Sequence, residues 1–427
     1  MLVAGGRLVD PSQPLDALRD LRIRNGIVVE IGEHLAPLEG EELFDAAGAI
    51  VAPGFIDMHV HLREPGDPQK ETIATGTEAA VRGGFTAVAC MPNTRPALDA
   101  PLVLEELAAL VAAAARCRVY PIAAITRGRR GVEACDFSAL TRAGAVAFSD
   151  DGETVADARV LREAALAARH GVFISHCEDA CLKGDSVMTE GPVARALGVR
   201  GAPAIAEDVI VARDLIIATE SAKPWHIAHL STRGALDQLR HARAHGARAT
   251  CEVTPHHLLL AQESVAQLGA AAKVNPPLRT QEDARALRDA VREGAIDALA
   301  TDHAPHTAAE KSGDLAHAAV GFSGLEIAVG AYASALPDLP LLRFVELLST
   351  NPARILGIPG GTLRAGSPAD LTIFAEREWV VDPSSFASKG KSTPFAGHRF
   401  SRRAIATIVG GELRYVSDGA AGSASGR

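Results

Sequence analysis

Two histidines stand two residues apart in the segment FIDMHVHLR, which spans residues 55–63. They are His59 and His61, and they end an apolar run that reads as a β-strand. Side chains two apart on a strand point to the same face, so both imidazoles are expected to converge on one point. Neutral imidazole is a preferred ligand of zinc and similar ions. The spacing therefore predicts a metal site, and a pair of exposed histidines on an edge strand is the alternative.

Short apolar runs and helical stretches alternate through the middle of the chain. The runs that read as strands cover residues 55–61, 86–91, 119–125, 145–149, 172–176, 226–230, 249–253 and 296–301. Between them lie stretches with apolar residues at helical spacing, such as residues 101–116, 156–169, 204–219 and 281–292. Eight strands that alternate with helices predict a parallel (β/α)8 barrel over residues 53–360.

Five of the eight expected strands end in residues that can bind a metal. Besides the two histidines, Asp150 and Asp151 follow the fourth strand, His176 ends the fifth, His229 lies near the end of the sixth, and Asp302 follows the eighth. The functional site of such a barrel lies at the C-terminal ends of its strands. Four histidines and two carboxylates can hold two divalent ions and leave positions open for water. We therefore expect a binuclear metal centre at this end of the barrel.

The two ends of the chain have a different pattern. Residues 1–52 and 361–416 contain short alternating segments, with hairpin turn signals at Asn25-Gly26 and Gly410-Gly411. This pattern predicts one small β-sandwich built from both ends and packed beside the barrel. Residues 417–427, with the sequence SDGAAGSASGR, have nothing to bury and are expected to form a flexible tail.

Composition excludes several classes of partner. The chain of 427 residues has a formal net charge of -9 and no basic runs, which argues against nucleic acid or an anionic membrane as the main partner. No segment reads as a transmembrane span or a secretory signal, so we expect a cytoplasmic protein. The six cysteines are scattered, and most are expected to act as small reduced hydrophobic residues.

Eight segments with polar or glycine- and proline-rich character recur through the chain: DMHVHLREPG, CMPNTRPALD, FSDDG, SHCED, AHLST, VTPHHL, KVNPPLR and ATDHAPH. In their order and spacing the chain resembles the bacterial type I dihydroorotases of the amidohydrolase superfamily. The resemblance implies two zinc ions per chain, of which one could bind weakly. The ligands it implies are His59, His61, Asp151, His176, His229 and Asp302, with Asp150 as the alternative to Asp151 for the bridging carboxylate.

The resemblance also implies a reaction and the residues that serve it. The reaction is the reversible cyclisation of N-carbamoyl-L-aspartate to dihydroorotate in pyrimidine biosynthesis, driven by a zinc-activated hydroxide, with Asp302 as the catalytic proton carrier. Arg63, Asn93 and His306 are implied to hold the ring carboxylate, which suits the planar guanidinium of arginine. Asn275 and the backbone near Gly321 and Phe322 are implied to contact the ring amides.

Two other functions are alternatives for this chain. A related cyclic amidohydrolase, an allantoinase or a hydantoinase, would keep the metal ligands but lack the carboxylate-binding residues. An inactive scaffold for aspartate transcarbamoylase would typically have lost metal ligands, whereas this chain keeps all six. The expected partners are a small-molecule substrate, a second copy in a homodimer, and aspartate transcarbamoylase in a mixed assembly. His226, His256 and His257 are expected to be structural.

Overall fold

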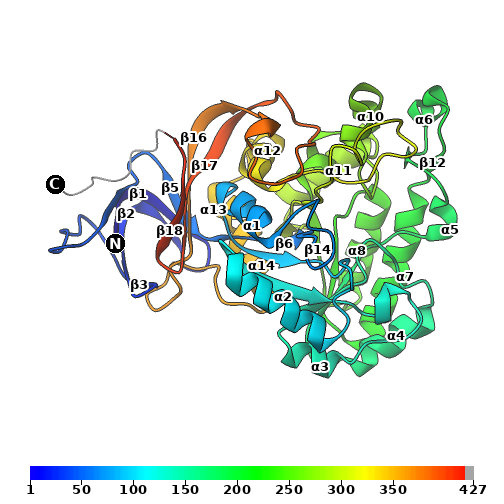
Figure 1. Ribbon diagram of the computed structural model, residues 1–427, viewed down its shortest axis with the longest axis horizontal. Helices are drawn as coiled ribbons and strands as arrows, with labels where there is room; N and C mark the ends of the chain where they lie inside the picture. Colours follow the sequence, from blue (N-terminus) through cyan, green and yellow to red (C-terminus); the bar gives the residue numbers. More distant parts are fainter. Residues whose placement is uncertain (419–427) are drawn as a thin grey trace.

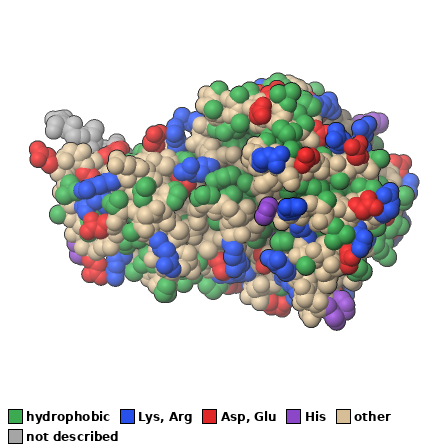
Figure 2. Space-filling view, turned by 90° about the horizontal axis from the view of Figure 1, so that it is seen from below, with side chains coloured by type: hydrophobic (Ala, Val, Ile, Leu, Met, Phe, Trp, Pro, Cys, Tyr) green, Lys and Arg blue, Asp and Glu red, His purple; other side chains and the backbone are tan. Residues whose placement is uncertain are grey.

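The computed structural model describes residues 1–418, so residues 419–427 of the predicted flexible tail lie outside the described residues. Figure 1 shows two parts side by side, a sheet that contains the N-terminus and a barrel surrounded by helices. On the face shown in Figure 2, basic and acidic side chains are interspersed rather than gathered into patches of one sign. Within residues 1–418, no helix has both the length and the apolar character needed to cross a lipid bilayer.

Eight parallel strands form the barrel. They are β6 (Phe55–Val60), β7 (Phe85–Cys90), β8 (Arg118–Ala123), β9 (Ala147–Phe148), β10 (Val172–Ser175), β13 (Trp225–Ile227), β14 (Ala249–Val253) and β15 (Ala298–Leu299), each paired with the next. A bridge between Val60 and His303 closes the barrel, and the backbone N–H of His61 donates to the His303 carbonyl at 2.9 Å. The predicted (β/α)8 fold is confirmed.

Helices follow the strands and cover the outside of the barrel. The main ones are α1 (Ile73–Arg82), α2 (Pro101–Ala114), α3 (Phe137–Arg142), α4 (Ala158–Ala167), α7 (Ile205–Ser221), α8 (Arg233–Ala244), α11 (Gln281–Arg292), α12 (Ala328–Ala335), α13 (Leu341–Val345) and α14 (Asn351–Leu356). Shorter helices occupy the loops: α5 (Ala180–Lys183), α6 (Pro192–Leu197), α9 (Pro255–Leu259) and α10 (Gln262–Leu268). Helix α11 shows why they form: Thr280 and Asp283 make a capping box, and Leu287 and Val291 are buried one turn apart.

The second sheet joins both ends of the chain. Its strands are β1 (Leu2–Asp10), β2 (Leu15–Arg24), β3 (Ile27–Gly32), β4 (Leu43–Asp45), β5 (Ile50–Pro53), β16 (Leu371–Val380), β17 (Arg399–Val409) and β18 (Glu412–Val416), in the order β18-β17-β16-β5-β1-β2-β3 with β4 beside β1. Both predicted turns join neighbouring strands, and all four turn residues have positive φ, as this type of hairpin requires. Apolar side chains from the N-terminal and the C-terminal strands share one core, so the sheet folds over as the predicted small β-sandwich.

A buried threonine connects this sheet to the first strand of the barrel. Thr372 of β16 accepts a hydrogen bond from the Phe55 backbone N–H at 2.8 Å and donates to the Gly84 carbonyl at 2.5 Å. Because Phe55 begins β6, this contact anchors the strand that carries the two histidines. The barrel strands beside it are almost fully buried, so their ends are held rigidly where the polar side chains gather.

Candidate metal centre and substrate cavity

Three predicted ligands meet where the first and last strands of the barrel end. His59 lies on β6, His61 follows it directly, and Asp302 follows β15. The Asp302 Oδ1 atom lies 3.0 Å from His61 Nε2 and 3.6 Å from His59 Nε2. Candidate ligand atoms of all three residues lie within 4.8 Å of one another, and all three are buried. The two-residue spacing thus brings both imidazoles to one point together with a carboxylate.

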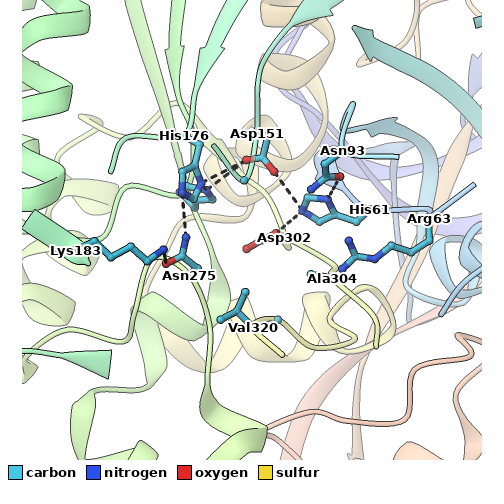
Figure 3. Close-up of a pocket in the computed structure, with 13 residues that line it drawn as sticks. His61, Arg63, Asn93, Asp151, His176, Lys183, Asn275, Asp302, Ala304 and Val320 are labelled. Atoms are coloured by element: carbon cyan, nitrogen blue, oxygen red, sulfur yellow. Dashed lines mark hydrogen bonds and ion pairs between the residues drawn. The ribbon is translucent and has the colours of Figure 1, made fainter. Parts of the chain in front are cut away.

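The other predicted ligands gather around Asp151. Its Oδ1 atom lies 3.3 Å from His59 Nε2, 3.6 Å from His176 Nδ1 and 3.7 Å from His229 Nε2. Its Oδ2 atom lies 3.6 Å from His61 Nε2. Asp151 therefore lies between two pairs of histidines, which is the position that a carboxylate shared by two metal ions would take (Figure 3).

The neighbouring Asp150 points elsewhere. Its Oδ1 atom accepts hydrogen bonds from the backbone N–H groups of Ile125 and Thr126, at 2.8 and 3.0 Å. It also accepts one from the Thr126 hydroxyl. These bonds use Asp150 to hold the loop that follows β8, so Asp151 is the one of the pair that lies among the histidines.

The donor set fits a bound cation. Burial and the charge of Arg63 lower the pKa of His61, so its imidazole is neutral, and its Nδ1–H donates to Asn93 Oδ1 at 2.8 Å. The lone pair of His61 Nε2 then faces the Asp302 carboxylate. His59 Nε2 and Asp151 Oδ1 are buried, and neither has a hydrogen-bond partner among residues 1–418. Electron-rich atoms that face one another in this way need a positive charge between them.

Electrostatics of the cluster lead to the same conclusion. Burial opposes the charged form of His59, but the negative charges of Asp151, Glu252 and Asp302 raise its pKa well above the usual value. For Asp302, burial is outweighed by the charge of His59 and the hydrogen bond with His61, which lower its pKa. A site that stabilises a proton this strongly also favours a metal cation in its place.

One buried acid that supports the cluster was not predicted from the sequence. Glu252 on β14 accepts a hydrogen bond from His59 Nδ1–H at 2.7 Å, and it lies 3.2 Å from His226 Nε2. It also accepts the backbone N–H of His229 at 3.2 Å. Glu252 thereby turns His59 Nε2 toward the cluster. A fully buried glutamate inside a barrel strand is rare, and a glutamate in the run ATCEV is the signal that could have identified it.

A cavity of about 180 Å³ opens beside the ligand cluster. Figure 3 shows Arg63 at one side of it and Lys183 at the other, with Ala304 and Val320 between them. Its wall contains His61, Arg63, Asn93, Asp151, Gly152, His176, Lys183, His229, Asn275, Asp302, Ala304, Val320 and Gly321. Four of the six predicted substrate-binding residues thus line the cavity: Arg63, Asn93, Asn275 and Gly321.

The other two, His306 and Phe322, lie just outside the cavity. The Phe322 side chain is buried against His256, with ring centroids 5.0 Å apart. His306 lies beside Arg63, and burial lowers its pKa to about 3, so it is neutral. Its Nε2–H donates to the Val320 carbonyl at 2.8 Å, so the same nitrogen cannot accept a hydrogen bond from the Arg63 guanidinium 3.3 Å away.

Among residues 1–418, the Arg63 guanidinium therefore has few hydrogen-bond acceptors. Its Nε–H donates to the Pro305 carbonyl at 3.2 Å. Within residues 1–418, no carboxylate forms a salt bridge with its guanidinium. Burial lowers the pKa of Arg63, which shows that its charge is partly removed from water. A guanidinium in this state favours an anionic ligand in the cavity.

Solved structures named as hydantoinases share the fold of this chain. L-Hydantoinase from Arthrobacter aurescens matches 96% of this chain and 95% of its own with a TM-score of 0.85 and 24% identity. D-Hydantoinase from Thermus sp. matches 97% of this chain and 96% of its own with a TM-score of 0.82 and 24% identity. The chain thus has the barrel fold of these hydantoinases, and in this chain His/Asp clusters that could hold metal ions lie at the ends of the barrel strands.

Sequence comparisons narrow the class to one family. A family model described as dihydro-orotase-like matches residues 48–235. The dihydroorotase of Pelotomaculum thermopropionicum is 48% identical over 419 residues, which are 97% of this chain and 98% of that protein. The dihydroorotase of Syntrophus aciditrophicus is 44% identical over 424 residues, which are 98% of this chain and 100% of that protein. The chain belongs to the dihydroorotase family.

Proposed function

We propose that this protein catalyses the reversible ring closure of N-carbamoyl-L-aspartate to (S)-dihydroorotate and water, a step of pyrimidine biosynthesis. The observation that carries the proposal is that the Arg63 guanidinium, with no carboxylate partner among residues 1–418, lies in the same cavity as the His/Asp cluster. Dihydroorotate has a ring amide that the cluster can act on and a carboxylate that Arg63 can bind. Hydantoin and allantoin lack that carboxylate, so the cavity suits dihydroorotate better.

We propose that the cluster holds two zinc ions, of which one could bind weakly. His59, His61 and Asp302 would hold one ion, His176 and His229 would hold the other, and Asp151 would be shared. When bound, such ions make a water molecule acidic enough to attack near neutral pH and polarise the carbonyl under attack. The orphaned buried atoms of His59 and Asp151 support this proposal.

Two residues of the chain have distinct roles in the proposed reaction. Arg63 binds the carboxylate that does not react and so fixes the ring in the cavity. Asp302, at the edge of the cluster, moves the proton. In hydrolysis it accepts a proton from the attacking water and delivers it to the ring nitrogen as the C–N bond breaks. In ring closure the same proton travels back, as the ureido nitrogen attacks the carboxyl carbon and water leaves.

An assay of both directions tests the proposed function. The purified protein should hydrolyse dihydroorotate and cyclise N-carbamoyl-L-aspartate, with closure favoured at acidic pH because it takes up a proton. Turnover of hydantoin and allantoin should be far slower. Elemental analysis should find up to two transition-metal ions per chain, and His61→Ala should lose metal and activity together. Preference for hydantoin or allantoin, or full activity in metal-free protein, would refute the proposal.

Further proposals concern organisation and partners. The family resemblance supports a cytoplasmic homodimer and an assembly with aspartate transcarbamoylase. It also supports division of the chain into a sandwich unit, residues 1–52 with 361–416, and a barrel unit, residues 53–360. Light scattering coupled to size-exclusion chromatography, with and without the transcarbamoylase, tests the two assemblies. A single peak at the monomer mass under both conditions would contradict them.

A further inference from the structure

Lys183 lines the cavity on the side opposite Arg63, although the sequence patterns did not point to it (Figure 3). It is the last residue of the short helix α5. Its Nζ atom forms an ion pair with Glu178 and donates a hydrogen bond to Asn275 Oδ1 at 2.9 Å. The Asn275 amide nitrogen donates to Glu178 Oε2 at 3.0 Å. The three side chains thus form a closed ring of hydrogen bonds at one wall of the cavity.

This ring permits only one orientation of the Asn275 amide. A lysine ammonium can only donate hydrogen bonds, and an ionised carboxylate can only accept them. With Oδ1 toward Lys183 and Nδ2 toward Glu178, both contacts are favourable. A flipped amide would place its NH2 group against the ammonium and its oxygen against the carboxylate. Lys183 and Glu178 together therefore fix the amide orientation, which a side-chain amide alone leaves open.

The fixed orientation limits what this wall can offer a ligand. One hydrogen of Asn275 Nδ2 goes to Glu178, and His176 Nε2, 3.0 Å away, occupies the other side of that nitrogen. Oδ1 keeps one lone pair, and Lys183 Nζ keeps one of its three hydrogens after its two contacts. One acceptor and one donor, 2.9 Å apart, therefore remain at this wall. The complementary ligand edge is a carbonyl beside an N–H, as in a cyclic amide or a ureide.

We propose that Lys183 is a positioning residue that holds Asn275 so that the pair reads the C=O/N–H edge of a ureide substrate. The inference rests on the proposed function and assigns the end of the substrate that faces away from Arg63. The two cations of the cavity then have separate tasks: Arg63 recognises the carboxylate, and Lys183 with Asn275 recognises the ring amide. Because Glu178 neutralises the charge of Lys183, the ligand carboxylate binds to Arg63 and not to Lys183.

Steady-state kinetics of Lys183→Met test this role. Methionine keeps the length of the side chain but removes the donors, so Asn275 Oδ1 loses its partner and only Glu178 still orients the amide. KM for dihydroorotate should rise roughly tenfold, the effect of losing one well-placed hydrogen bond to a charged group. At the same time kcat should stay within about threefold of the parent, and the metal content should not change. Lys183→Arg, which retains donors, should lie nearer the parent than Lys183→Met.

A double-mutant cycle separates positioning from direct support of the site. In an Asn275→Ala background, Lys183→Met should raise KM much less than it does alone, because the group it positions is absent. Arg24→Met is the control, because Arg24 is an exposed cation at the end of β2 in the other sheet and outside the cavity wall, so its KM should equal that of the parent. Additive effects, an unchanged KM in Lys183→Met, or a loss of metal in that variant would overturn the inference.

The role of Lys183 and the proposed function can fail separately in these kinetic assays. If the parent hydrolysed hydantoin or allantoin in place of dihydroorotate, the proposed function would fail. Both rings carry the same C=O/N–H edge, so a roughly tenfold rise in their KM in Lys183→Met would still support the role of Lys183. An active parent with an unaffected Lys183→Met variant would refute the inference and leave the proposed function standing.

Discussion

Replacing Arg63 by methionine should change which ring the enzyme prefers. The guanidinium donates from Nε to the Pro305 carbonyl, and no carboxylate among residues 1–418 pairs with its two terminal amino groups, so both are available for a bidentate contact with a ligand carboxylate. Hydrogen bonds to charged groups contribute about 1.5–3 kcal/mol each, and such contributions are not additive. We expect a loss of about 3 kcal/mol, which is roughly a hundredfold in kcat/KM for dihydroorotate. Methionine keeps the aliphatic stem in place, so packing changes little.

The assay compares dihydroorotate with 5,6-dihydrouracil, which is the same ring without the carboxylate. Arg63→Met should lower kcat/KM for dihydroorotate and leave the slower turnover of dihydrouracil nearly unchanged, so the ratio of the two falls about a hundredfold. Metal content, measured on the same preparations, should match the parent. An equal fall for both rings would mean that Arg63 supports the structure of the site and does not recognise the carboxylate.

Three other substitutions test separate parts of the reasoning. Asp302→Asn keeps the shape of the side chain but cannot carry a proton, so kcat should fall about 10² to 10⁴-fold in both directions with metal retained; loss of metal would instead identify Asp302 as chiefly a ligand. Glu252→Gln weakens the hydrogen bond that orients His59, so a chelator should strip metal at 10- to 100-fold lower concentration, and equal resistance to the chelator would contradict this role. Burial raises the pKa of Glu326 to about 7, above its value of 4.5 when unfolded, so the folded state holds this proton more tightly and the contribution to stability is lost as pH rises from 4.5 to 7. As pH rises from 4 to 8, the unfolding free energy of Glu326→Gln should therefore increase relative to that of the parent by up to about 3 kcal/mol, as measured by urea unfolding. A stability difference that is the same at both pH values would refute this.

The architecture could be predicted from the sequence because each pattern involves only residues that lie close together in the chain. The period-two alternation and the Asn25-Gly26 turn predicted the first hairpin of the sandwich, and both turn residues adopt the positive φ that such a turn needs. The alternation of apolar runs with helices predicted the barrel, since a parallel sheet is built from such units. Because the strands of a barrel all point one way, the polar residues after them had to meet at one end, as His59 and Asp302 do.

The choice between neighbours and the contacts between distant loops were decided only by tertiary structure. Asp150 and Asp151 are adjacent and chemically identical, and only the path of the chain after β9 turns the first toward the loop at Thr126 and the second toward the histidines. Glu252 contacts His59, which is 193 residues away in the sequence, and Lys183 contacts Asn275, which is 92 residues away. The spacing of apolar residues shows which face of its own helix or strand a residue occupies. Which side chain it contacts on the other side of the barrel depends on how all eight strands close.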